Sequence, residues 1–84
     1  MQHKVKKMVW HQLFVKGNLD RFAMKKIDET INMFGGMVHA PEGIPVQEAD
    51  GTWEVRILEG GSLSIAKNIL LKGGLEIVRE VENV

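Results

Sequence analysis

Three histidines, His3, His11 and His39, are the only imidazoles that this chain could use for metal binding or proton transfer. His11 falls on an expected central strand and His39 near the edge of the same sheet, a poor geometry for two ligands of one metal ion. No Ser/His/Asp or paired-carboxylate pattern occurs at local spacing. We therefore expect a protein without enzymatic activity, resident metal or cofactor, whose histidines are packed or surface residues.

A second chemical candidate is the segment Glu59-Gly60-Gly61-Ser62, which precedes an expected helix. The first amides of a helix lack partners within the helix and can bind a phosphate or a carboxylate. Gly60, Gly61 and Ser62 are therefore candidate anion or effector residues. The alternative is a flexible turn with a capping serine, since neither a GxGxxG nor a Walker pattern is present.

Length and composition favour one small domain over residues 1–84. Because the chain contains no cysteine, disulfides and thiolate metal sites cannot reinforce its core, which favours self-association. Residues 1–41 hold seven basic and three acidic side chains, and residues 42–84 hold four and eight. We interpret this asymmetry as pairing between strands rather than a nucleic-acid surface. Neither a signal peptide nor a spanning helix is recognised, so we expect no membrane contact and a cytoplasmic location.

The apolar residues switch between strand and helix spacing in the order βαββαβ. A first strand is expected over residues 5–16, followed by a helix over 19–34 that Asn18 caps. Gly35 and Gly36 end this helix. Its apolar stripe consists of Leu19, Phe22, Ala23, Ile27, Ile31 and Phe34.

The second half of the chain predicts a hairpin, a helix and a last strand. Pro41 and Pro45 cannot donate hydrogen bonds to a ladder, so the strand at 44–49 is expected at a sheet edge. A two-residue turn at Asp50-Gly51 joins this strand to another at 52–58. A helix over 63–72, capped by Ser62 and ended by Gly73-Gly74, precedes a strand over 75–81 with Leu75, Ile77 and Val81 inward.

This order predicts an α+β domain of ferredoxin-like type, because both βαβ crossovers must be right-handed. The expected architecture is a four-stranded antiparallel sheet with two helices on one face. Its strand order, fourth-first-third-second, puts the proline-bearing strand on an edge. It also brings Lys4, Lys6 and Lys7 of the first strand beside Glu80 and Glu82 of the last.

The first strand does not alternate cleanly between apolar and polar residues, as a sheet covered on one side should. Trp10 and Phe14 are expected to project from the helix-free face, with Met8, Arg56 and Leu58 nearby. Exposed aromatic clusters mark interfaces or binding grooves. We therefore expect these residues to form a homo-oligomer or binding face, and coverage by the chain's own termini is the alternative.

The segment Leu13-Phe14-Val15-Lys16-Gly17-Asn18-Leu19 resembles the first short motif of RNA-recognition-motif domains, which are also ferredoxin-like. That resemblance implies single-stranded RNA binding, with bases stacked on Phe14 and Trp10. On the third strand, however, Thr52 and Glu54 stand where that family has aromatic residues. Nucleic acid is therefore the less favoured partner, since the chain also carries no net positive charge.

The turn Gly17-Asn18-Leu19 followed by Phe22 also resembles the first strand-to-helix turn of ACT-like regulatory domains. The segment Leu70-Leu71-Lys72-Gly73-Gly74-Leu75-Glu76-Ile77-Val78 resembles their passage into the last strand, although Lys16 replaces a frequent proline. The resemblance implies a small non-enzymatic regulatory module that binds an amino acid or another small effector between subunits. Gly17, Asn18 and Leu19 would then be effector residues, and a purely structural assembly protein is the remaining alternative.

Overall fold

The computed structural model of the protein describes residues 10–83. It forms an α+β domain, and the predicted positions of Met8 and of the three N-terminal lysines lie outside the described residues. The elements follow one another as β1 (Trp10–Lys16), α1 (Arg21–Met33), the 3-10 turn η1 (Pro41–Gly43), β2 (Val46–Gln47), β3 (Trp53–Leu58), α2 (Leu63–Lys72) and β4 (Glu76–Asn83).

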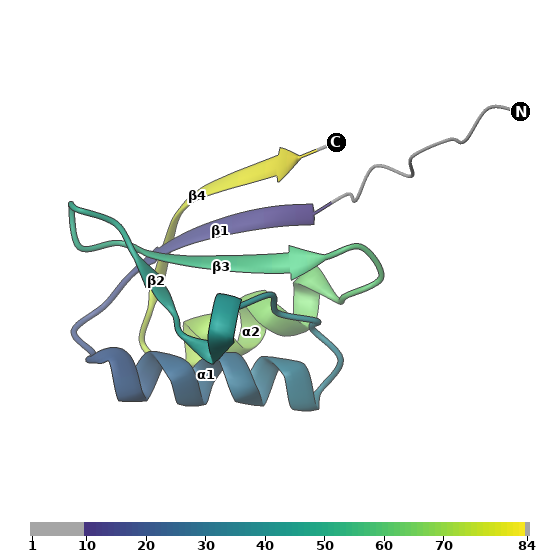
Figure 1. Cartoon of the computed structure of the whole chain (residues 1–84), viewed down its shortest axis with the longest axis horizontal. Helices are drawn as coiled ribbons and strands as arrows, with labels where there is room; N and C mark the ends of the chain where they lie inside the picture. Colours follow the sequence, from purple (N-terminus) through teal and green to yellow (C-terminus); the bar gives the residue numbers. More distant parts are fainter. Residues whose placement is uncertain (1–9, 84) are drawn as a thin grey trace, which may run out of the picture.

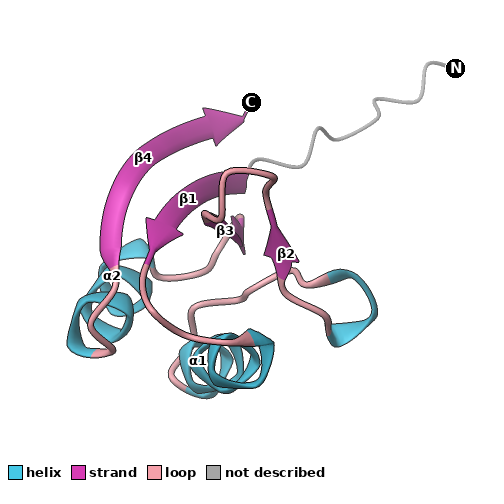
Figure 2. Cartoon of the chain, turned by 90° about the vertical axis from the view of Figure 1, so that its left-hand side faces the viewer, coloured by secondary structure: helices cyan, strands magenta, loops and turns pink. Residues whose placement is uncertain are grey.

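The four strands form one antiparallel sheet in the order β2-β3-β1-β4 (Figures 1 and 2), as the sequence predicted. The predicted edge strand over 44–49 is reduced to Val46–Gln47. Earlier in the chain, Val38 bridges to Ile57 on β3, and residues 40–45 lie between these two contacts outside any strand. Pro41 and Pro45 explain the interruption, because neither can donate to a ladder.

The hydrophobic core joins one face of the central strands to both helices. Leu13 and Val15 of β1 alternate with residues of the other face, as strand geometry requires. Their buried partners come from β3, from both helices and from the start of β4: Met24, Ile31, Trp53, Val55, Ile57, Ala66, Leu70 and Leu75.

Of the apolar stripe predicted for helix α1, Ile31 lies in the core, and Leu19 and Ile27 pack against it. Met24, Asp28 and Ile31 are buried, whereas Phe22 and Phe34 are 84% and 60% exposed. The buried residues have spacings of four and three, so they form a stripe of their own. The prediction was therefore wrong for Phe22, Ala23 and Phe34, which are exposed, and it omitted Met24 and Asp28.

The predicted cap of α1 was also wrong. Asp20, rather than Asn18, is the N-cap residue, and its carboxylate accepts a hydrogen bond of 2.9 Å from the N–H of Ala23. Both residue types cap helices well. In α2 the prediction is confirmed, because the helix covers Leu63–Lys72 and the hydroxyl of Ser62 accepts from the N–H of Ile65.

The β2–β3 connection is a three-residue loop rather than the predicted two-residue turn. The N–H of Glu48 donates to the carbonyl of Thr52 at 2.8 Å, and the N–H of Gly51 donates to the carbonyl of Glu48 at 3.0 Å. Gly51 has φ of 91°, which confirms the predicted positive φ. Such loops combine a turn with one left-handed residue.

We expect Gly51→Val to lower the free energy of unfolding by about 1 kcal/mol or more, because a β-branched residue is strained at this φ. No atom lies within 4 Å of the position of an added Cβ, so the loss would come from the backbone alone. Urea denaturation measures it, and Gly51→Asn is the matched control because asparagine tolerates positive φ better. An equal loss in both variants would contradict the backbone explanation.

Strand β4 contains a β-bulge that reverses its alternation. Phe14 pairs with Arg79 and Val15 with Ile77, so Val78 is an extra residue on β4. Beyond the bulge, Glu80 lies on the core side and forms a 2.8 Å ion pair with Lys67 of α2. Val81 pairs with Gln12 on the opposite face. The prediction that Val81 faces inward was therefore wrong.

Candidate functional site

The face of the sheet opposite the core carries alternating aromatic and polar residues. On β1 these are Trp10, Gln12 and Phe14, each one residue away from the core positions of that strand. Their register partners share this face. Phe14 lies between Glu54 of β3 and Arg79 of β4, and Trp10 lies opposite Leu58.

Glu54 is the centre of a polar network on this face. Its Oε1 accepts hydrogen bonds from Gln12 Nε2 at 2.5 Å and from Arg56 Nε at 2.6 Å. Burial raises the pKa of Glu54, but the hydrogen bonds from Arg56 and Gln12 outweigh it, so that its pKa lies below the ordinary value. The network therefore holds an ionised carboxylate on the sheet face opposite the core.

Two arginines cover the aromatic residues that were expected to be exposed. The guanidinium carbon of Arg56 lies 5.1 Å from the ring centroid of Trp10, and that of Arg79 lies 4.2 Å from the centroid of Phe14. Both distances are typical of cation–π contacts. Phe14 is only 7% exposed, so the expectation of an exposed ring was wrong. A base could stack on it only after displacing Arg79.

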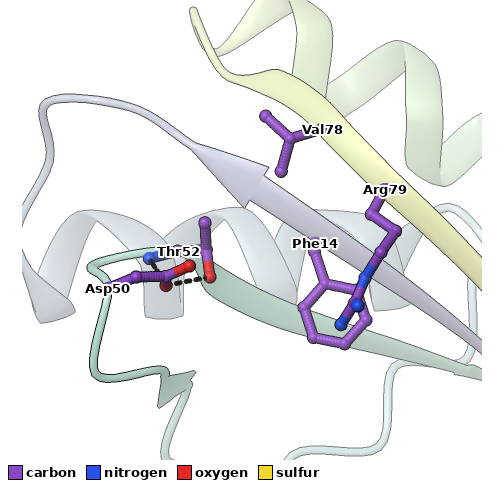
Figure 3. A pocket seen from close by; sticks show the side chains of 5 residues that line it. All are labelled: Phe14, Asp50, Thr52, Val78 and Arg79. Atoms are coloured by element: carbon purple, nitrogen blue, oxygen red, sulfur yellow. Dashed lines mark hydrogen bonds between the residues drawn. The ribbon is translucent and has the colours of Figure 1, made fainter.

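A pocket of about 290 Å³ lies at the Phe14 end of this face (Figure 3). Five residues line it, from β1, from β4 and from the β2–β3 loop: Phe14, Asp50, Thr52, Val78 and Arg79. The bulge at Val78 is the local cause, because it turns Arg79 onto the same face as Phe14. In Figure 3 the guanidinium lies against the Phe14 ring, and Asp50 with Thr52 stands on the other side.

The pocket combines a cation and an anion over an apolar floor. Within residues 10–83, Arg79 makes no ion pair, and its cation–π contact leaves the N–H groups at the guanidinium edge able to donate. Hydrogen bonds from the hydroxyl and the backbone N–H of Thr52, 2.6 and 3.0 Å long, lower the pKa of Asp50. Such a pocket can bind a small molecule that carries both a carboxylate and an ammonium group.

The two glycine-containing segments predicted as effector sites lie apart from this pocket and from each other. Gly17, Asn18 and Leu19 follow β1, whereas Gly60, Gly61 and Ser62 follow the antiparallel β3, so they lie at opposite ends of the sheet. A Cβ at Gly17 would overlap the side chain of Leu75, and one at Gly61 would overlap the carbonyl of Gly36. Both glycines therefore allow close packing.

The backbone N–H groups of the residues just before α2 already donate hydrogen bonds within the protein. The N–H of Gly61 donates to Leu58 at 2.9 Å, and the N–H of Ser62 donates to Gly35 at 3.1 Å. The bond from Ser62 to Gly35 ties the β3–α2 loop to the end of α1. The geometry thus favours the capping turn over the anion site for this segment.

Asp28 is an acidic residue on the core side of α1. It is 5% exposed, and its Oδ1 has no hydrogen-bond partner among the described residues. Burial alone raises the pKa of Asp28 to about 7. The carboxyl group therefore titrates near neutral pH, although it lies away from the pocket on the other face.

Sequence reasoning missed Arg79, Asp50 and Thr52 as lining residues of the pocket. The doublet Ile77-Val78 was the available signal, since two adjacent apolar residues interrupt the alternation of β4 and are compatible with a bulge.

Among residues 10–83, no group of three or more His, Asp or Glu side chains could hold a metal ion. None of the helices in the described part has the length and apolar character needed to cross a bilayer.

Comparison of the chain with protein-family models, with curated proteins and with solved structures returned no match.

Proposed function

We propose that this protein is a small, non-enzymatic regulatory module that binds a free amino acid in the pocket beside Phe14 and Arg79. The observation that carries the proposal is the guanidinium of Arg79, which lies over the Phe14 ring, 4.2 Å from its centroid, with no ion-pair partner in the described residues. An arginine oriented in this way is suited to a planar carboxylate, which it can bind through two parallel hydrogen bonds.

The other pocket residues select the remainder of the ligand. Asp50, whose pKa is lowered by Thr52, supplies a negative charge for an ammonium group. Phe14 and Val78 supply apolar surface for a side chain, and about 290 Å³ is sufficient for a molecule of this size. A zwitterion with an apolar side chain, such as leucine, matches all three features.

The proposal includes an ACT-like relationship and a ferredoxin-like fold with both helices on one sheet face. The element order βαββαβ and the core shared by both helices with β1 and β3 support this assignment. The site differs from the turn at Gly17 to Leu19 that the resemblance implied. A cytoplasmic location and self-association belong to the same proposal.

A thermal-shift experiment with leucine at millimolar concentrations tests the function. The comparison ligands are the amine that leucine gives on decarboxylation and the acid that it gives on deamination. We expect leucine to raise the melting midpoint, because a ligand that binds only the folded state stabilises it by mass action. Each analogue lacks one charge and should bind more weakly. Arg79→Met should weaken leucine binding about tenfold to a hundredfold. This factor corresponds to the binding free energy of one charge-assisted hydrogen-bond pair.

Arg21→Met is the matched control, because Arg21 is an exposed arginine at the start of α1 and away from the pocket. It should leave the leucine response unchanged. Failure of all twenty amino acids to shift the midpoint would refute the proposal, as would equal binding of leucine by Arg79→Met. Salt-dependent binding of oligonucleotides instead would select the nucleic-acid alternative.

A further inference from the structure

The outward side of α1 carries two of the most exposed large apolar side chains of the described protein. Phe22 is 84% exposed and Met33 is 77% exposed. They lie eleven residues apart, which is close to three helical turns, so both point to the same side. That side is opposite Met24, Asp28 and Ile31, which are buried. Figure 1 shows α1 along the lower border of the molecule, where no other element covers it.

Two charged residues lie between these apolar residues on the same stripe. Phe22, Lys26, Glu29 and Met33 have spacings of four, three and four. Neither Lys26 nor Glu29 makes an ion pair within residues 10–83. We name these four residues the α1 stripe.

The α1 stripe is self-complementary under two-fold rotation. When two copies of α1 pack antiparallel about a point midway between Ile27 and Asp28, Phe22 of one copy lies opposite Met33 of the other. The same rotation places Lys26 opposite Glu29, twice. An isologous interface requires this reciprocity, in which residue i contacts j and j contacts i.

The shape of the helix surface agrees with its charge pattern. A shallow groove of about 300 Å³ lies at one end of the stripe, lined by Phe22, Lys25, Lys26 and Glu29. The protruding Met33 lies at the other end, about 16 Å from Phe22 along the helix axis. Two-fold pairing brings the Met33 side chain of each copy to the groove of the other. Methionine suits such a contact because its unbranched side chain adapts to irregular surfaces.

We propose that the α1 stripe is a homodimer interface whose occupant is a second copy of this chain, paired antiparallel through α1. The sheet face is less suited to this role, because Arg56 and Arg79 already cover its aromatic residues. One helix pair buries less surface than a standard stable interface. The dimer is therefore weak, with a dissociation constant of about 10 to 1,000 μM.

Charge reversal tests the pairing by sedimentation equilibrium at low salt. Lys26→Glu places glutamate opposite glutamate, and Glu29→Lys places lysine opposite lysine, so each variant should dimerise about tenfold more weakly than the wild type. An equimolar mixture of the two variants should recover wild-type affinity as a heterodimer, because all its cross-pairs are again of opposite sign. The double variant Lys26→Glu/Glu29→Lys should recover it as a homodimer.

The mixture distinguishes contacts between chains from effects within one helix. Each variant carries the same altered charges alone and in the mixture, so a recovery of affinity in the mixture must come from contacts between chains. Phe22→Ser should also weaken dimerisation at least tenfold, whereas Phe34→Ser, on another side of the helix end, should not. Circular dichroism checks that every variant is folded. A wild-type monomer at millimolar concentration would overturn the proposal, as would a mixture that remains monomeric. The test uses no ligand, so its result is independent of amino-acid binding.

Discussion

Asp28→Asn is expected to remove most of the decline in stability between pH 5 and pH 8. The folded-state pKa of Asp28 is raised to about 7 from an ordinary value of 3.8, so the folded protein retains a proton that the unfolded chain has already lost. Stability from this group is therefore complete below the unfolded pKa and is lost as pH rises through the folded pKa. Over this interval the wild type should lose about 3 kcal/mol of unfolding free energy.

Urea denaturation at pH 5 and pH 8 measures the difference. The difference in unfolding free energy between the asparagine variant and the wild type should be about 3 kcal/mol larger at pH 8 than at pH 5. Asp20→Asn is the matched control, because it replaces an exposed aspartate with another good N-cap residue. Parallel pH profiles for Asp28→Asn and the wild type would show that the carboxyl group is solvated in the folded protein.

Gly61→Ala is expected to lower the unfolding free energy by about 3 kcal/mol, which is large for one added methyl group. That methyl group would overlap the carbonyl oxygen of Gly36 and would lie 2.9 Å from Cγ2 of Ile57. Because the first obstacle is backbone, it cannot rotate away as a side chain could. The loop would have to move, at the expense of the hydrogen bond from Ser62 to Gly35.

Gly73→Ala provides the comparison for this packing argument. Its added Cβ would meet Cδ1 of Ile27 at 3.2 Å, the far end of a flexible side chain, so we expect a loss below about 1 kcal/mol. Chemical denaturation of both variants at one pH decides the matter. Equal stability of Gly61→Ala and the wild type would mean that the two loops are not in close contact.

The sequence predicted element order and sheet topology well, because both depend on local periodicity and on proline and glycine positions. Helix α2 has the predicted ends, since Ser62 and Gly73 act through local hydrogen bonds. The edge position of β2 followed from Pro41 and Pro45 for an equally local reason. The short length of β2 could not be predicted in this way, because it depends on how residues 40–45 leave the sheet.

The candidate site was much less predictable than the fold. Trp10 and Phe14 were assigned to the correct face, but their coverage by Arg56 and Arg79 depends on contacts between strands. Arg79 reaches Phe14 only because of an extra residue on β4. The buried side of α1 was predicted only in part, because neither Met24 nor the charged Asp28 was expected in a core position.

The bulge at Val78 also affects the open edge of β4 as a template for strands of other molecules. In the described part of the chain, β4 pairs only with β1, which leaves eight residues of strand with an open outer edge. A long regular edge is a template on which strands of other molecules can add. The extra residue interrupts the even spacing of backbone donors and acceptors along that edge, and Glu76 and Glu82 add repulsion between copies. The local irregularity that turns Arg79 toward Phe14 therefore also protects the edge against intermolecular β-sheet growth.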